Sequence, residues 1–206
     1  IQYTGATDST DRNITTTTAI TLQIDVANPS TSLTWNGATT NTTGLLNKLG
    51  PGILVLSGSN LHTGVTSAFA GTLKYGAANV ISTGGVSVIN GTLDINNYSD
   101  SVGAIILQNG GQIVDSGGTS AVLTSTAQFN FQSGKVSARL GSAVAAGLSK
   151  TTPDRVILSG DNTFTSTSIA LSAGALNLQH NNALGASGTT LTTTVTGGAN
   201  AVLELQ

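Results

Sequence analysis

Five glycines recur along the chain, and each stands at the centre of the same local pattern. Alternating apolar residues precede and follow the glycine, as in TSAFAGTLKY (66–75) and VSVINGTLDI (86–95). Alternation with a period of two is typical of a β-strand, because successive side chains point to opposite faces. A glycine between two such runs lets the chain bend without the steric cost of a Cβ atom. The pivots are Gly71, Gly91, Gly111, Gly134 and Gly174, evenly spaced over the first three and more widely after that.

A unit of about 20 residues with two or three short strands is too small to close a core of its own. Units stacked about 4.8 Å apart share one interior and pair their backbones in parallel. We therefore predict an all-β fold, a parallel β-helix (β-solenoid) with coils of about 20 residues and an N-terminal strand or cap segment. A β-meander or sandwich, with turns about every 8–12 residues, is the alternative. A meander or sandwich does not require one motif to return at a fixed spacing, so the repeat favours the β-helix.

A longer repeat lies over the short one. Its copies are 48–81 and 150–185, and each begins with a lysine. The lysine is followed by an L-S-G tripeptide and then by an asparagine two residues later. The shared motif positions are Leu56, Ser57, Gly58 and Asn60 in the first copy, and Leu158, Ser159, Gly160 and Asn162 in the second.

The pattern K-x-G-x-G-x-L-x-L-S-G-x-N at 48–60, with G-T-L at 71–73 and N-A-L-G at 182–185, has a known counterpart. It resembles the autotransporter-associated β-strand repeat, or passenger-associated transport repeat. The resemblance implies a right-handed β-helix, export and display at a bacterial cell surface, and no catalytic chemistry. The chain departs from the family pattern at His62, where an aromatic residue is expected.

Composition excludes several functions. The few basic residues are scattered singly, so no cluster of positive charge is available to bind nucleic acid. No apolar run approaches the roughly 18 residues of a membrane-spanning helix. The chain has no cysteine, which excludes disulfides and thiolate metal sites. We expect no cofactor.

An enzyme acting on polysaccharide is a remote alternative, because glycoside hydrolysis needs two carboxyl groups about 5–9.5 Å apart. Asp94 and Asp115 are the one acidic pair on neighbouring units. With Gly91 over Gly111, Asp94 stacks on Val114, and the two carboxylates point to opposite faces. We therefore predict no enzyme and no catalytic residue.

The two histidines do not indicate a metal site, since they lack the local spacing of metal ligands. His62 is expected to fill the family's aromatic position and to pack at a turn. His180 lies in the turn QHNNALG and is expected to be exposed.

The sequence suggests two parts, an N-terminal capping or donated-strand segment at 1–35 and a β-helix domain at 36–206. The chain starts at Ile1 without a signal sequence, as a mature or excised fragment would, and it ends on the strand pattern AVLELQ. Unpaired edges at the ends of a β-helix invite pairing with another chain. Candidate subunit contacts are Ile20, Leu22, Ile24, Val26, Val202, Leu203 and Leu205.

Taken together, these patterns predict an extracellular or cell-surface structural β-solenoid that self-associates end to end into a fibre or surface layer. Its partners would be copies of itself, with extracellular polysaccharide or another surface as a further possibility. The alternative is an adhesin-like passenger or stalk segment of an autotransporter that binds a surface or a polysaccharide. Neither function requires nucleic acid or a membrane-spanning segment.

Overall fold

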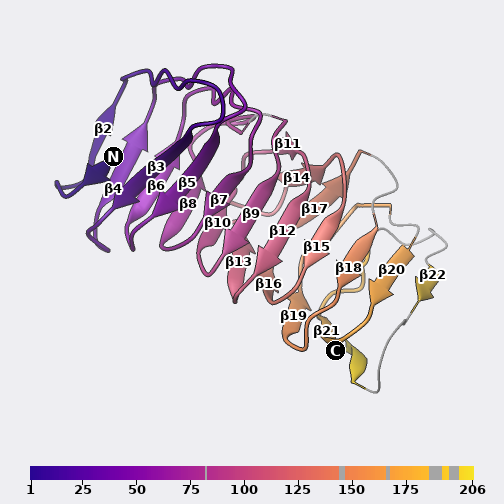
Figure 1. The fold of residues 1–206 in the computed structure, drawn as a ribbon. Coiled ribbons are helices and arrows are strands. Elements are labelled where there is room, and N and C mark those ends of the chain that lie inside the picture. Colours follow the sequence, from indigo (N-terminus) through magenta and orange to yellow (C-terminus); the bar gives the residue numbers. More distant parts are fainter. Residues whose placement is uncertain (82, 144–146, 166–167, 186–191, 195–199) are drawn as a thin grey trace.

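The structure is a computed structural model that describes residues 1–206 except 82, 144–146, 166–167, 186–191 and 195–199. The regular elements in the described part are β-strands, stacked in coils along one axis with the termini at opposite ends (Figure 1). The prediction of an all-β parallel solenoid is therefore confirmed. No described segment forms a helix of the length and apolarity needed to cross a membrane.

Two sheets run the length of the solenoid, and we name them sheet A and sheet B. Sheet A contains β1 (Gln2–Tyr3), β3 (Thr21–Val26), β5 (Leu45–Leu49), β7 (Thr66–Ala68), β9 (Val86–Ile89), β12 (Ile105–Gln108), β15 (Phe129–Phe131), β18 (Leu148–Lys150), β20 (Ser168–Leu171) and β22 (Thr192–Thr194). Sheet B contains β2 (Asp8–Thr10), β4 (Ser32–Trp35), β6 (Ile53–Leu56), β8 (Thr72–Tyr75), β10 (Thr92–Asp94), β13 (Gly111–Val114), β16 (Gly134–Val136), β19 (Arg155–Leu158), β21 (Gly174–Leu178) and β23 (Ala201–Leu205).

A third face closes each coil between sheet B and the next strand of sheet A. In the N-terminal half it consists of single parallel bridges that join Ile14, Thr39, Asn60 and Ile81. Further along it becomes sheet C, made of β11 (Asp100–Val102), β14 (Val122–Ser125) and β17 (Arg139–Ser142). The coil therefore has a triangular course with three corners.

The strand register gives the length of each coil. In the middle of sheet B, Thr72 pairs with Thr92 and Thr92 with Gln112, so two successive coils have the same length. The coil that joins Ile53 to Thr72 is one residue shorter than these. The last coil, which joins Gly174 to Ala201, is the longest in this sheet. The stacking is thus regular in the middle of the chain and variable elsewhere.

Sheet B turns rows of side chains inward, and one of these rows is aliphatic in every coil from β6 to β19. Leu54, Leu73 and Leu93 stack in register and are fully buried. Burial of each such side chain contributes roughly 1.5–3 kcal/mol to folding. The row continues through Ile113, Val136 and Leu158. These rows form the continuous interior that no single coil could provide.

The N-terminal segment 1–35 contributes β1 to β4 to the same two sheets. Within β3, Ile24 and Val26 are buried in the core. The segment is therefore built as coils of the solenoid, and a capping or strand-donating role for it remains a proposal.

Candidate functional site

The five pivot glycines lie at one corner, where the chain passes from sheet A to sheet B. Gly71 has a φ of +59° and Gly174 a φ of +70°, in the region that favours glycine. Gly134 has a φ of +128°, and a Cβ atom there would lie 2.1 Å from the carbonyl oxygen of Gly111 in the coil beneath. Conformation and close backbone approach both require glycine here.

Gly174 does not continue the column of the other pivots. Gly134 pairs with Val156 and Val156 with Leu176, two residues beyond Gly174. The corner between β18 and β19 holds the four residues 151–154, whereas those before β16 and β21 hold two. The longer corner shifts the register, so the sequence step from Gly134 to Gly174 does not correspond to two regular coils.

The L-S-G motif ends a strand of sheet B in both copies. A Cβ atom on Gly58 would lie 2.1 Å from the carbonyl oxygen of Gly37, and one on Gly160 would lie 2.3 Å from that of Ala138. Neighbouring coils approach too closely at this corner for a side chain. The other motif members are Leu56 and Leu158, which are fully buried, and Ser57 and Ser159, whose backbone N–H groups donate to the preceding coil at 2.9 Å.

The motif asparagines are buried and connect coils. Nδ2 of Asn60 donates to the carbonyl oxygen of Val80 at 2.9 Å, and Nδ2 of Asn162 donates to that of Ala183 at 2.8 Å. Oδ1 of Asn162 also accepts the backbone N–H of Leu140 at 2.8 Å. The side chains thus satisfy backbone groups where regular strand pairing is interrupted.

Lys48 points into the solenoid, and its side chain is fully buried. Its Nζ donates to the carbonyl oxygens of Leu49 at 2.7 Å, Gly50 at 2.8 Å and Ala70 at 3.1 Å. Ala70 belongs to the next coil, so the ammonium joins two successive corners. Burial lowers the pKa of Lys48 to about 8, and the charge of Asp25 partly opposes this shift.

Lys150 repeats this arrangement in the second copy. Its Nζ donates to the carbonyl oxygen of Thr152 in its own coil and, at 3.1 Å, to that of Ala173 in the next. Burial also lowers the pKa of Lys150. Sequence reasoning paired these lysines but assigned them no role; the signal was their position at the start of both repeat copies.

Asp100 is a buried acid that sequence reasoning did not single out. Its Oδ2 accepts the backbone N–H of Ile81 at 3.0 Å, and its Oδ1 accepts that of Ser101 at 2.8 Å. Burial raises the pKa of Asp100 despite these hydrogen bonds. Asp100 thus accepts a backbone N–H of the preceding coil, as Asn162 accepts the N–H of Leu140.

Asp94 stacks on Val114, and its carboxylate is held by several donors. Nζ of Lys74 lies 3.0 Å from its Oδ2, and Oγ of Ser116 donates to the same oxygen at 2.5 Å. Burial opposes ionisation, but hydrogen bonds from Ser116, Lys74 and Asn96 outweigh it, and the pKa of Asp94 is lowered. The carboxylate is thus engaged in a network that links three coils.

His62 is buried, and its Nε2 lies 2.8 Å from Oγ1 of Thr66. Phe164, its counterpart in the second copy, packs against Phe129 with ring centroids 4.9 Å apart. His180 is partly exposed, and its Nδ1 lies 3.9 Å from Oδ1 of Asp161. Among the described residues, no group of three or more His, Cys, Asp or Glu side chains is arranged to hold a metal ion.

The residues predicted as subunit contacts fall into two groups. Of the four predicted contacts in the N-terminal segment, only Ile20, half exposed, presents its side chain to solvent; Leu22 is partly buried and packs against the core. In β23 the side chains are exposed, namely Val202, Leu203 and Leu205. Ile24 and Val26 have interior side chains that serve the core, and their strand β3 is paired with β1 on one side and β5 on the other.

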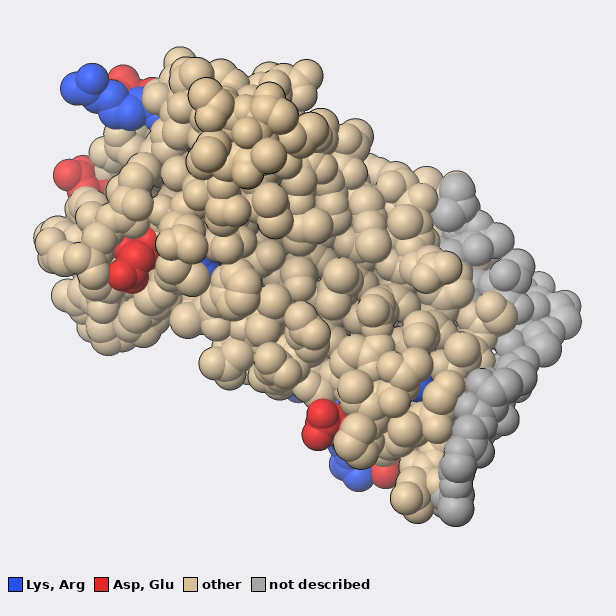
Figure 2. Space-filling model, viewed as in Figure 1, with Lys and Arg blue, Asp and Glu red and all other residues tan. Residues whose placement is uncertain are grey.

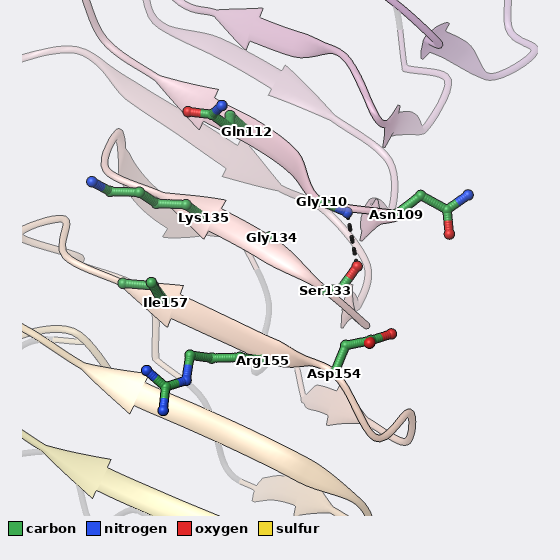
Figure 3. A pocket seen from close by; sticks show the side chains of 9 residues that line it. All are labelled: Asn109, Gly110, Gln112, Ser133, Gly134, Lys135, Asp154, Arg155 and Ile157. Atoms are coloured by element: carbon green, nitrogen blue, oxygen red, sulfur yellow. Dashed lines mark hydrogen bonds between the residues drawn. The ribbon is translucent and has the colours of Figure 1, made fainter.

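The outer face of sheet B carries an open groove of about 590 Å³ beside the glycine corner. Gln112, Lys135 and Ile157 form one row across three strands, while Asn109 and Asp154 project from the corner (Figure 3). At the same corner, Oγ of Ser133 accepts a hydrogen bond from the backbone N–H of Gly110 at 2.8 Å (Figure 3). The polar side chains spread over an open surface.

A second concavity of about 330 Å³ lies at the corner between sheets B and C, and we name it the insertion pocket. Asp94 pairs with Val114 on sheet B before this corner, and Asp100 pairs with Leu123 on sheet C after it. The later coil therefore gains three residues at the corner, and they lie in the loop 115–121, which forms one wall. Its lining includes Asp115, Thr119, Ser137, Arg139, Asp161 and His180.

One curated protein is similar to part of this chain. It is the adhesin BmaC autotransporter of Brucella suis biovar 1 (strain 1330), 39% identical over 105 residues. The match covers 50% of this chain and 3% of that protein, so the chain spans a small part of its relative. No protein-family model and no solved structure matches the chain. The similarity and the solenoid together fit repeats of the autotransporter type.

Proposed function

We propose that this chain is a segment of a cell-surface, adhesin-like autotransporter passenger, in which stacked coils form a rigid spacer and display surface. The observation that carries the proposal is the 39% identity to an autotransporter adhesin, found in a chain that folds as a solenoid. Buried polar residues repeated in both copies serve the scaffold, which favours a structural over an enzymatic role. The autotransporter-associated β-strand repeat is the family we propose for the motif.

Labelling of intact cells tests this function. An antibody against residues 1–206 should stain unpermeabilised cells of the organism that encodes the chain, and external protease should remove the signal. Deletion of the gene should reduce adhesion of these cells to a surface. Staining that requires permeabilisation would contradict the proposal.

End-to-end self-association into a fibre or layer is a second candidate. It is supported by the low charge of the chain, since only 8% of residues are charged and repulsion between copies is therefore weak. Figure 2 shows a face of the solenoid that is largely free of charged side chains. Light scattering across a concentration series and electron microscopy should reveal oligomers or filaments, and a monomer at all concentrations would exclude this candidate.

A further inference from the structure

The insertion pocket is shaped by unequal loop lengths in successive coils. The loop 115–121 between β13 and β14 has seven residues, whereas the next coil passes from β16 to β17 through only Ser137 and Ala138. The long loop stands above the short link, and Asp161 and His180 of later coils line the same pocket. Ser137 and Arg139 therefore lie in a recess between neighbours.

Two buried polar atoms in this pocket have no hydrogen-bond partner, Oδ2 of Asp115 and Nε of Arg139. The other oxygen of Asp115 accepts the backbone N–H groups of Asn97 at 2.6 Å and Gly117 at 3.2 Å, which fixes the carboxylate. Nearly all buried polar groups in folded proteins are hydrogen-bonded. Two exceptions in one pocket point to a polar ligand.

The charges of the pocket alternate along the stack. Asp115, Arg139 and Asp161 come from three successive coils, which are about 4.8 Å apart. Among the described residues, the guanidinium of Arg139 forms no ion pair with either carboxylate. Asp161 instead accepts a hydrogen bond from Nδ2 of Asn182 at 2.7 Å. Within the part of the chain that the structure describes, no carboxylate therefore occupies the terminal nitrogens of the Arg139 guanidinium.

We propose that the insertion pocket binds an oligosaccharide that carries a sugar carboxylate, as a uronic acid does. The carboxylate would accept the fork of Arg139, the group best suited to bidentate recognition of such an anion. Sugar hydroxyls would donate to Asp115 and Asp161. A polyphosphate is disfavoured because it has no hydroxyl groups to donate to the two carboxylates, which are acceptors only. The proposal deepens the surface function proposed above, on which its biological setting rests.

Calorimetry with the purified chain tests the ligand class. The probes are a galacturonate tetrasaccharide and the galactose tetrasaccharide of the same linkage, which differ in the carboxylate. We expect the acidic sugar to bind about tenfold more tightly, the effect of one charge-assisted hydrogen-bonded pair. Equal binding of the two sugars, or no binding of either, would overturn the proposal.

Two variants with matched controls locate the site. Arg139→Gln should abolish the preference for the acidic sugar, while Arg12→Gln, the loss of one exposed cation elsewhere, should preserve it. Asp115→Asn keeps an oxygen for the two backbone donors, so it should fold normally and still weaken binding of both sugars about fivefold. Asp11→Asn should have no effect.

An equal loss in Arg12→Gln and Arg139→Gln, or unchanged binding in Asp115→Asn, would contradict the pocket as the site. These measurements use purified protein, so their outcome does not depend on the labelling of intact cells, which tests the surface location.

Discussion

The two copies of the long repeat, 48–81 and 150–185, share buried polar residues inside the solenoid and differ outside it. Inside, each copy buries a lysine and an asparagine. Outside, the first copy turns through Gly-Pro-Gly at 50–52, whereas the second has the longer corner 151–154. The second copy also contributes Asp154 to the open groove and Asp161 to the insertion pocket.

This difference separates scaffold from surface. A buried backbone group must be hydrogen-bonded, so the side chains that satisfy it are constrained in every copy. An outward loop can change length at low cost in free energy, because loop closure depends only weakly on length. Residues that repeat therefore serve the stack, and residues that break the repeat are the place to look for a binding site.

The largest expected effect is at the pivot glycines. Gly71→Ala and Gly174→Ala should each lower the free energy of unfolding by about 2–4 kcal/mol, because an added Cβ atom meets backbone and φ is positive. That Cβ would lie 2.3 Å from the carbonyl oxygen of Gly52 or of Asp154, respectively. Urea denaturation followed by circular dichroism measures the change.

Gly110→Ala is the matched control. Gly110 also has a positive φ, +78°, but a Cβ atom there would have no neighbour within 4 Å. We expect a loss of only about 1–2 kcal/mol, the cost of the backbone conformation alone. An equal loss at all three glycines would contradict the role of close coil approach.

Loss of the motif asparagine should destabilise the fold more in the second copy than in the first. Asn162→Ala should cost about 2–4 kcal/mol, because it leaves the N–H of Leu140 and the carbonyl of Ala183 without the side-chain partner. Asn60→Ala removes hydrogen bonds to carbonyl oxygens only and should cost about 1–2 kcal/mol. Denaturation of both variants under the same conditions checks the order, and the reverse order would show that the motif asparagines do not act as described.

Replacement of either buried lysine should destabilise the fold by a similar amount. Lys48→Met and Lys150→Met should each lower the free energy of unfolding by about 1 kcal/mol, since lost hydrogen bonds to carbonyl oxygens outweigh relief from burying an ammonium. Lys135→Met, on the exposed surface, should change stability by less than about 0.5 kcal/mol. A stabilised Lys48→Met would mean that burial of the charge dominates.

The smallest expected effect is the pH dependence at Lys48. Its pKa is about 8 in the folded chain, against an ordinary value of 10.5. Well below the lower value the lysine is charged in both states, and between the two values the unfolded chain binds more protons. The free energy of unfolding should therefore rise with pH in this window, by about 1 kcal/mol or less for the first pH unit above the folded value. Subtracting the same curve for Lys48→Met isolates the effect, and a falling difference would contradict it.

The solenoid could be predicted from the sequence because every coil repeats the same local physics. Gly71, Gly91 and Gly111 are evenly spaced in the sequence, and the strands that follow them stack at the same spacing. Period-two alternation then decides which side chains are inward. None of this depends on contacts with a remote part of the chain.

The interior lysines and the insertion pocket could not be predicted in this way. Lysine is rarely buried, and Lys48 is tolerated because carbonyl oxygens of its own coil and of Ala70 in the next coil accept hydrogen bonds from its Nζ. Asp115 and Arg139 line one pocket only because of the register of two coils. The wider step between Gly111 and Gly134 signals an insertion, but not the corner at which it lies.

Cysteine cross-linking tests the stacked register most directly, because the chain has no cysteine of its own. Thr92 and Gln112 pair in register on the outer face of sheet B, at the strand spacing of about 4.8 Å that a disulfide can span. Thr92→Cys with Gln112→Cys should form a disulfide under mild oxidation. Thr92→Cys with Val114→Cys, displaced by two residues, should not. Cross-linking of the second pair and not the first would contradict the stacked register and the coil length that follows from it.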